Sequence, residues 1–194
     1  MTNRLTEHPS FKNYAVIKIV KKFNIRKSLD VVSIDGRYFE FGVYRGSSIN
    51  YIASLRPDKT IYGFDSFQGL PEEWRTSYKI YPKGHFSTNG ELPTVANNVV
   101  LVSGWFEDSL PEFCNNNPTE PTAFIHIDAD LYSSAKTIFK YLGHTFVPGT
   151  VIVFDEWFSQ GHEDRAFMEW LEENDRYACA IISTDKQRTF IITQ

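Results

Sequence analysis

Short apolar runs alternate along the chain with segments whose apolar residues recur at helical spacing. The apolar, β-branched runs predict buried parallel strands at residues 37–43, 59–65, 98–104, 122–128 and 150–155. Helical spacing predicts helices at residues 9–28, 47–55, 107–114, 133–146 and 163–174. Two further apolar runs, 177–184 and 188–194, are separated by the tight connection Asp185-Lys186-Gln187, which predicts a β-hairpin.

Strand and helix therefore alternate five times before a terminal hairpin. This order is typical of a doubly wound, mostly parallel α/β sheet with one antiparallel strand, from the terminal hairpin, at or near an edge. A length of 194 residues suits one domain, so we expect a single unit over 1–194 with an N-terminal helical segment over 1–30.

The stretch from 66 to 97 does not follow this alternation. It holds three prolines, at 71, 82 and 93, and three glycines, at 69, 84 and 90, with little periodicity. Irregular loops of this length in compact domains usually have a function or move. We predict a lid or substrate-recognition loop here.

Composition limits the classes of partner. A net charge of -4 argues against general binding to nucleic acid or to an anionic membrane, and no apolar run is long enough to span a bilayer. Cys114 and Cys179 form no metal-like or disulfide-rich pattern, which favours a reducing compartment. The N-terminus lacks a signal-peptide core, so the expected location is the cytoplasm.

Two acidic clusters carry the clearest chemical signal. Asp128 and Asp130 follow the fourth predicted strand, and Asp155 and Glu156 follow the fifth. Ligands of open α/β sheets bind beyond the carboxyl ends of the strands. Four carboxylates gathered there would resist full ionisation unless a cation joined them, and oxygen-only ligands suit Mg²⁺. A metal-assisted site is expected, although these acids could instead only end strands and cap helices.

The turn after the first strand and the end of the second suggest a nucleoside pocket. The turn is Glu40-Phe41-Gly42-Val43-Tyr44-Arg45-Gly46-Ser47, whose glycines allow a sharp bend but do not make the dinucleotide fingerprint. Asp65 ends the next strand, where an acid commonly accepts hydrogen bonds from ribose hydroxyls. Taken alone, an exposed turn acid is the better interpretation of Asp65. His126 lies within a strand and is better explained as a buried, hydrogen-bonded histidine than as a catalyst.

Six motifs in order resemble the macrocin O-methyltransferase (TylF/MycF) family of class I S-adenosylmethionine-dependent enzymes. The resemblance covers about residues 38–175, and its motifs are EFGVYRGSS, YGFDSFQGLPEEW, KGHFST, VSGWFEDSLP, HIDADLYSSAKTIF and VIVFDEWF. It implies the seven-stranded methyltransferase sheet, S-adenosylmethionine and Mg²⁺ as cofactors, and a small hydroxylated acceptor such as a sugar. A homo-oligomer is also compatible with it.

The resemblance also implies roles for individual residues. Glu40 and Gly42 would shape the pocket for the methionine part of the cofactor, and Asp65 would bind the ribose. The adenine would be bordered by Ser66 and Phe67 on one side and by Gly104, Trp105 and Phe106 on the other, although Trp105 and Phe106 are equally compatible with core packing.

Asp128 would face both the cofactor amine and the metal. Asp128, Asp155 and Glu156 would then bind Mg²⁺, and Asp130 would be the general base. The family usually has two aspartates where this chain has Asp155-Glu156, which leaves the metal geometry open. Two alternatives remain: a nucleoside-binding protein of the same fold without methyl transfer, and a metal-dependent hydrolase that uses the same acids.

Overall fold

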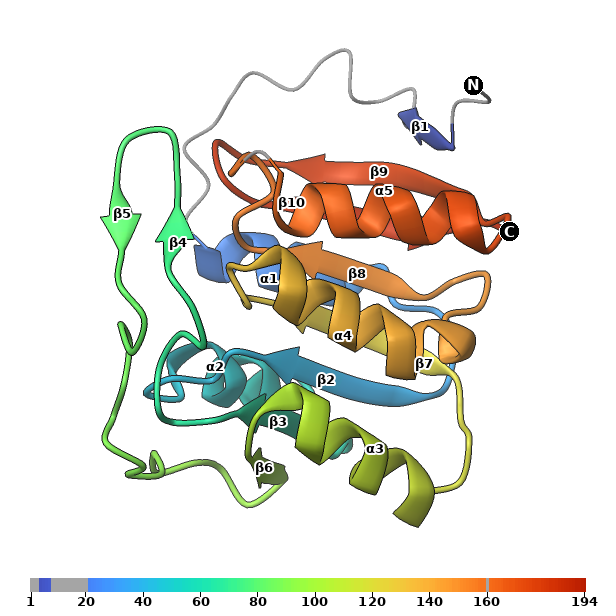
Figure 1. The fold of residues 1–194 in the computed structure, drawn as a ribbon. Coiled ribbons are helices and arrows are strands. Elements are labelled where there is room, and N and C mark those ends of the chain that lie inside the picture. Colours follow the sequence, from blue (N-terminus) through green and yellow to red (C-terminus); the bar gives the residue numbers. More distant parts are fainter. Residues whose placement is uncertain (1–3, 8–20, 160) are drawn as a thin grey trace.

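A computed structural model describes residues 4–7, 21–159 and 161–194. Its main sheet has eight strands in the order β1-β9-β10-β8-β7-β2-β3-β6 (Figure 1). The strands are β1 (Leu5–Glu7), β2 (Arg37–Phe41), β3 (Ile61–Asp65), β6 (Val99–Ser103), β7 (Thr122–Ile127), β8 (Val151–Phe154), β9 (Ala178–Ser183) and β10 (Arg188–Ile192). All pairs are parallel except those that β10 makes with β8 and β9, so the predicted mostly parallel sheet and terminal hairpin are confirmed.

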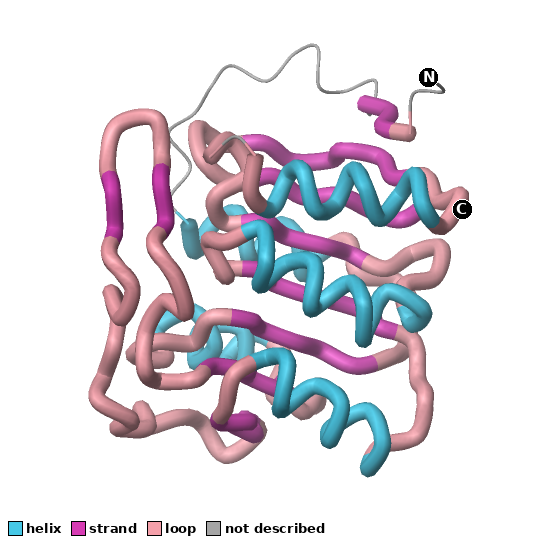
Figure 2. Tube along the Cα trace, viewed as in Figure 1, coloured by secondary structure: helices cyan, strands magenta, loops and turns pink. Residues whose placement is uncertain are grey.

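Helices cover both faces of the sheet (Figure 2). One face carries α3 (Phe106–Asn116), α4 (Tyr132–Leu142) and α5 (Glu163–Glu173), and the other carries α1 (Lys21–Asp30) and α2 (Ser47–Leu55). A short 3₁₀ turn, Gly143–Thr145, follows α4. None of the helices in the described ranges is long and apolar enough to cross a membrane.

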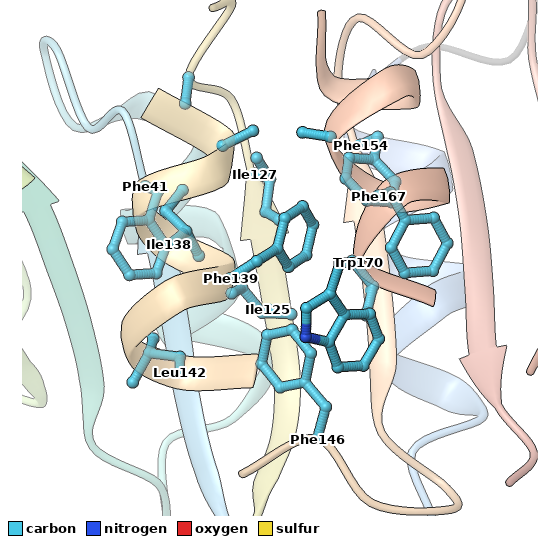
Figure 3. Close-up of a cluster of buried hydrophobic side chains, with 14 of the residues drawn as sticks. Phe41, Ile125, Ile127, Ile138, Phe139, Leu142, Phe146, Phe154, Phe167 and Trp170 are labelled. Atoms are coloured by element: carbon cyan, nitrogen blue, oxygen red, sulfur yellow. The ribbon is translucent and has the colours of Figure 1, made fainter. Parts of the chain in front are cut away.

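Aromatic rings fill the space between the sheet and helices α4 and α5 (Figure 3). The ring of Phe139 lies 5.6 Å from Trp170, 5.8 Å from Phe167 and 6.1 Å from Phe146, measured between centroids. Strand β7 is buried along its whole length, as a central parallel strand must be. This packing fixes the ends of β7 and β8, from which the acidic clusters project.

The N-terminal segment 1–30, predicted as helical with its helix at 9–28, also contains a strand that was not predicted. Residues Leu5–Glu7 form β1, which pairs in parallel with β9 and adds an eighth strand to the expected seven. The edge of β9 offers unpaired backbone groups, and a short extended segment satisfies them. Helix α1 is described over Lys21–Asp30, and residues 9–20 of the predicted helix 9–28 lie outside the described residues.

The strand order changes direction between β2 and β7, where β2 leads on to β3 and β6 on one side and β7 leads on to β8 on the other. Such a switch point opens a crevice at the carboxyl ends of the strands. The segment 66–97 runs beside these ends and includes the two-stranded β4 (Trp74–Arg75) and β5 (Ile80–Tyr81) (Figure 1).

Truncating Phe139 tests the importance of the aromatic core. Phe139→Ala removes a ring that is 3% exposed and should lower the free energy of unfolding by about 3–5 kcal/mol, because it leaves a cavity. Phe158→Ala, at a ring that is 47% exposed, is the matched control and should change it by about 0.5 kcal/mol or less. Urea denaturation measures both, and equal losses would contradict this account of the core.

Candidate active site

A cleft of about 410 Å³ lies at the switch point, a size suited to a small-molecule ligand. Residues at the ends of five parallel strands line it: Gly42, Asp65, Gly104, Asp128 and Asp155. The loop 66–97 contributes a further wall. The cleft therefore lies at the strand ends where the sequence predicts the acidic and cofactor-binding residues. Its lining comes from segments that are far apart in the chain.

The turn after β2 requires glycine at position 42. Gly42 has a φ of 89°, and a Cβ atom there would lie 1.9 Å from the carbonyl oxygen of Asp128. The end of β2 and the start of the acidic cluster are therefore in direct backbone contact, and the amide of Asp128 donates to the carbonyl of Phe41 at 2.9 Å. A side chain at position 42 would push the two segments apart.

Asp65 closes the same turn from the neighbouring strand. Its carboxylate accepts hydrogen bonds from the backbone N–H groups of Tyr44 and Phe67, both at 2.7 Å. Tyr44 and Phe67 themselves have positive φ values of 51° and 58°, a conformation that costs free energy in residues other than glycine. Asp65 thus holds two unfavourable backbone turns at the rim of the cleft.

All four acids of the two predicted clusters line this one cleft: Asp128, Asp130, Asp155 and Glu156. Asp130 is 8% exposed and has a φ of 60°, so the backbone holds its side chain in an unusual direction. Burial, followed by the charge of Asp128, raises the pKa of Asp130 well above its ordinary value. A buried acid held in a strained conformation beside other acids is typical of a functional group.

Glu163, in the first turn of α5, supports this cluster from behind. Its carboxylate accepts from the backbone N–H groups of Ala129 at 3.0 Å, Asp130 at 3.2 Å and Glu156 at 3.4 Å. Burial raises the pKa of Glu163 to about 8, with the charge of Asp128 the next cause. Glu163 was not predicted, because in sequence it is indistinguishable from a solvent-exposed acid at a helix start.

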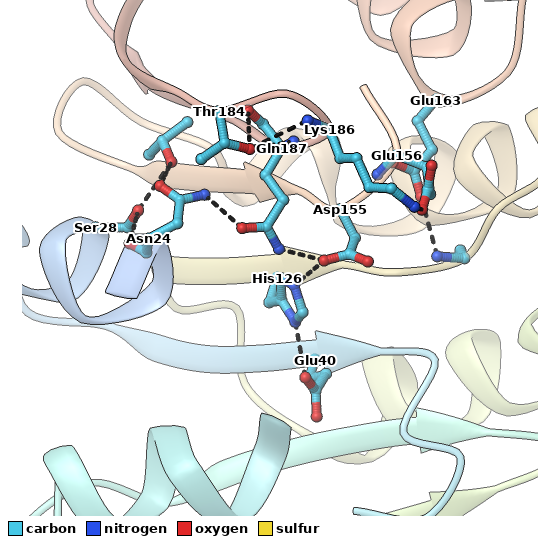
Figure 4. A network of polar contacts seen from close by, with 12 residues as sticks. Asn24, Ser28, Glu40, His126, Asp155, Glu156, Glu163, Thr184, Lys186 and Gln187 are labelled. Carbon is cyan, nitrogen blue, oxygen red and sulfur yellow. Dashed lines mark hydrogen bonds and ion pairs between the residues drawn. The ribbon is translucent and has the colours of Figure 1, made fainter. Parts of the chain in front are cut away.

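Residues of the terminal hairpin bind the second acidic pair (Figure 4). The Gln187 amide donates to Asp155 Oδ1, and Lys186 Nζ lies 3.3 Å from Glu156 Oε1. Gln187 also accepts from Asn24 of α1 at 3.0 Å, inside the protein. The connection predicted only as a turn therefore orients two candidate metal ligands, a role that no local pattern indicates.

His126 is buried and hydrogen-bonded, as predicted. Its Nδ1 lies 2.7 Å from Glu40 Oε1, and its Nε2 lies 3.7 Å from Asp155 Oδ1 (Figure 4). One ligand atom each from His126, Asp128 and Asp155 lie within 4.8 Å of one another, a grouping that could hold a metal ion. The structure thus groups His126, rather than Glu156, with the two aspartates.

The structure brings most, but not all, of the predicted cofactor residues to the cleft. Those that line it are Gly42, Asp65, Ser66, Gly104, Trp105, Phe106 and Asp128. Glu40 and Phe67 do not: Glu40 lies beneath it against His126, and the Phe67 ring is packed in the core formed with α1 and α2. Phe106 does both, since it lines the cleft and packs edge-on against Phe41 at 5.2 Å.

Aromatic residues of the loop 66–97 form the opposite wall. Trp74 and Tyr81 stack with ring centroids 4.6 Å apart, and Phe86 lies 5.9 Å from Tyr81. The loop is attached to the body of the protein through His162, whose Nε2 donates to the Arg75 carbonyl at 3.0 Å. The cleft therefore has an acidic wall and an aromatic wall.

These features define a small-molecule site on a methyltransferase-type α/β fold, and comparison with known proteins gives the family. The chain belongs to the family described as "Methyltransferase domain", whose match covers residues 39–157. The resemblance to the macrocin family stays a prediction.

Two curated relatives are similar over part of their length. Demethyldecarbamoylnovobiocin O-methyltransferase of Streptomyces niveus is 26% identical over 73% of this chain and 62% of that protein. Mycinamicin III 3''-O-methyltransferase of Micromonospora griseorubida is 23% identical over 64% of this chain and 56% of that protein. The alignments thus span less than two thirds of each relative.

Solved structures share the fold. CalS11, a calicheamicin methyltransferase, superposes with a TM-score of 0.71 at 21% identity, over 88% of this chain and 77% of that one. The O-methyltransferase NovP superposes with a TM-score of 0.68 at 22% identity, over 90% and 80% of the two chains. The predicted class I methyltransferase architecture is confirmed.

The raised pKa of Glu163 predicts how stability depends on pH. An acid whose pKa rises on folding, here from 4.5 to about 8, binds its proton more tightly in the native state. Its contribution is therefore fully present below about pH 4.5 and is lost as pH rises toward 8. In Glu163→Gln, the free energy of unfolding should therefore fall less steeply with rising pH, by on the order of 1 kcal/mol per pH unit.

Urea denaturation between pH 5 and 8, with EDTA present, measures the slope for the wild type and Glu163→Gln. Glu172→Gln, at an exposed acid of the same helix, is the control and should retain the wild-type slope. Parallel curves for the wild type and Glu163→Gln would show that Glu163 is not protonated in the folded protein.

Proposed function

We propose that this protein is an S-adenosylmethionine-dependent O-methyltransferase acting on a hydroxyl of a sugar or another small polyol-bearing molecule. The observation that carries the proposal is one cleft that holds both Asp65, at the end of β3, and the acids that follow β7 and β8. Asp65 is suited to bind the ribose of a nucleoside, and the acids after β7 and β8 are suited to activate a reacting hydroxyl. Membership of the methyltransferase-domain family supports the combination and does not favour a hydrolase.

The residues of the cleft fit S-adenosylmethionine. Asp65 can accept hydrogen bonds from two ribose hydroxyls, and Gly42 lines the same cleft, where it lets the end of β2 lie against the Asp128 backbone. Glu40 lies beneath the cleft rather than in its lining, and its Oε2 is buried and has no hydrogen-bond partner among the described residues. A buried carboxylate oxygen without a donor is costly, and the ammonium of the methionine part would satisfy it. Bound S-adenosylmethionine supplies a methyl group on a good leaving group.

Asp130 is proposed as the general base. It lies in the cleft beside Asp128, and burial among other acids raises its pKa toward that of a group able to take a proton from a hydroxyl. A divalent cation held by Asp128 and Asp155 would lower the pKa of the acceptor hydroxyl. The protein's own contribution is to orient the hydroxyl, accept its proton at Asp130 and exclude water.

The loop 66–97 is proposed to bind the acceptor. Its aromatic wall, Trp74, Tyr81 and Phe86, faces the same cleft as the acids. Aromatic faces pack well against the apolar face of a sugar ring, which leaves the ring hydroxyls free to point toward Asp130. The names of the two curated relatives refer to O-methylation of antibiotics, which supports a natural-product acceptor. The macrocin subgroup, the cytoplasm and a homo-oligomer stay predictions.

Titration with S-adenosylhomocysteine tests the cofactor site. Asp65→Asn should weaken binding about 10- to 100-fold, because the amide keeps the volume but loses the charge that accepts the ribose hydroxyls. Asp58→Asn, at an exposed acid before β3, should bind like the wild type. Calorimetry measures each affinity, and wild-type binding by Asp65→Asn would remove Asp65 from the site.

Replacement of Asp130 tests the chemistry separately from binding. With a panel of hydroxylated glycosides and S-adenosylmethionine, Asp130→Asn should reduce formation of S-adenosylhomocysteine by at least 100-fold, since general-base catalysis contributes about 10²–10⁴-fold. Its affinity for S-adenosylhomocysteine should stay within threefold of the wild type. Full activity of Asp130→Asn would exclude Asp130 as the base, and wild-type activity that survives EDTA would exclude the cation.

A further inference from the structure

The buried imidazole of His126 lies between Glu40 and Asp155, one of the acids that line the cleft. We propose that His126 binds the cation together with Asp128 and Asp155, and that the site therefore prefers a first-row transition ion such as Mn²⁺ to Mg²⁺. This inference rests on the proposed function, because the same cation would serve the reacting hydroxyl. It replaces the oxygen-only set Asp128, Asp155 and Glu156 expected from the sequence.

The distances suit one ion. The three candidate ligand atoms lie within 4.8 Å of one another, and His126 Nε2 is 3.7 Å from Asp155 Oδ1. Two ligand atoms that each bind a metal at about 2.1 Å lie roughly 3 to 4.2 Å apart, depending on the coordination angle. Small side-chain rotations would bring all three atoms to one centre.

The other side of the imidazole ring is already arranged as a metal-binding histidine requires. Glu40 Oε1 accepts from His126 Nδ1 at 2.7 Å, with both side chains inside the protein. Metal-binding histidines usually donate their second ring N–H to a carboxylate, which fixes the tautomer and directs the lone pair of the other nitrogen at the metal. With the proton on Nδ1, the lone pair of Nε2 points toward Asp155.

Glu156 is engaged elsewhere. Its carboxylate pairs with Lys186 at 3.3 Å (Figure 4). It also accepts from Ser159 Oγ at 3.1 Å. Asp155, by contrast, is oriented by the Gln187 amide, and a hydrogen-bonded carboxylate is the usual form of a metal ligand. The arrangement of this chain therefore offers two carboxylates and one imidazole to a cation.

The ligand set decides the metal. Mg²⁺ prefers oxygen ligands in a near-ideal octahedron, whereas imidazole suits transition ions, with Mn²⁺ also accepting carboxylates. We expect the full chain, freed of metal with EDTA and dialysed, to bind Mn²⁺ at least tenfold more tightly than Mg²⁺ in calorimetric titrations. In the Mn²⁺-loaded wild type, electron spin-echo envelope modulation should detect an imidazole ¹⁴N bound to the metal.

His126→Asn separates a ligand from a structural role. The asparagine amide reproduces the Nδ1 donor to Glu40 but has no atom in the place of Nε2. Mn²⁺ binding should weaken at least tenfold and lose the ¹⁴N signal, whereas Mg²⁺ binding should change less than threefold. His144→Asn, at an exposed histidine of the 3₁₀ turn, should behave as the wild type.

The failures of the two proposals can be told apart. Mn²⁺ bound to the wild type without an imidazole ¹⁴N signal, or equal losses of Mn²⁺ and Mg²⁺ affinity in His126→Asn, would overturn the role of His126 and leave the methyltransferase intact. Absence of binding by either ion would overturn this inference together with the cation of the proposed reaction. Titration with S-adenosylhomocysteine on the same samples reports separately on the cofactor site.

Discussion

The gathering of carboxylates at one edge of the sheet is the constraint on which the rest of the site depends. Asp128, Asp130, Asp155 and Glu156 share one cleft with Glu163 behind them, and such a cluster is stable only when its charges and lone pairs are compensated. The compensation comes from several sources. Backbone N–H groups donate to Glu163, whose raised pKa also favours its protonated form. Gln187 and Lys186 of the hairpin contact Asp155 and Glu156, and His126 lies between Glu40 and Asp155.

This compensation links parts of the fold that are far apart in the chain. Gln187 connects Asp155 to Asn24, so α1 and the terminal hairpin both help to orient an acid of the family-matched region 39–157. Ser28 and Thr189 extend the connection with a hydroxyl–hydroxyl bond of 2.8 Å. Buried hydrogen bonds of this kind favour one arrangement of the groups they join, so the network gives Asp155 a defined position.

The loop 66–97 contributes aromatic side chains to the cleft that also contains the acids. Its rings supply apolar surface to the cleft. The loop is joined to the body by polar contacts, the His162 ring with the Arg75 carbonyl and Ser133 Oγ donating to Glu72 at 2.5 Å. It is also joined by apolar contacts, because Phe67 packs in the core with α1 and α2, and Leu70 and Trp74 pack with Leu131.

The sequence by itself determined the alternation of strands and helices, the mostly parallel character of the sheet, the terminal hairpin and the acids at the ends of β7 and β8. Apolar periodicity and the rule that parallel strands end at one edge are local or topological, so they are visible in the chain. Only the tertiary structure decided which side chains support those acids. Glu163, Lys186 and Gln187 look like surface residues in sequence, and β1 reads as part of a helix-rich segment. Their roles depend on contacts with distant residues, which local patterns do not encode.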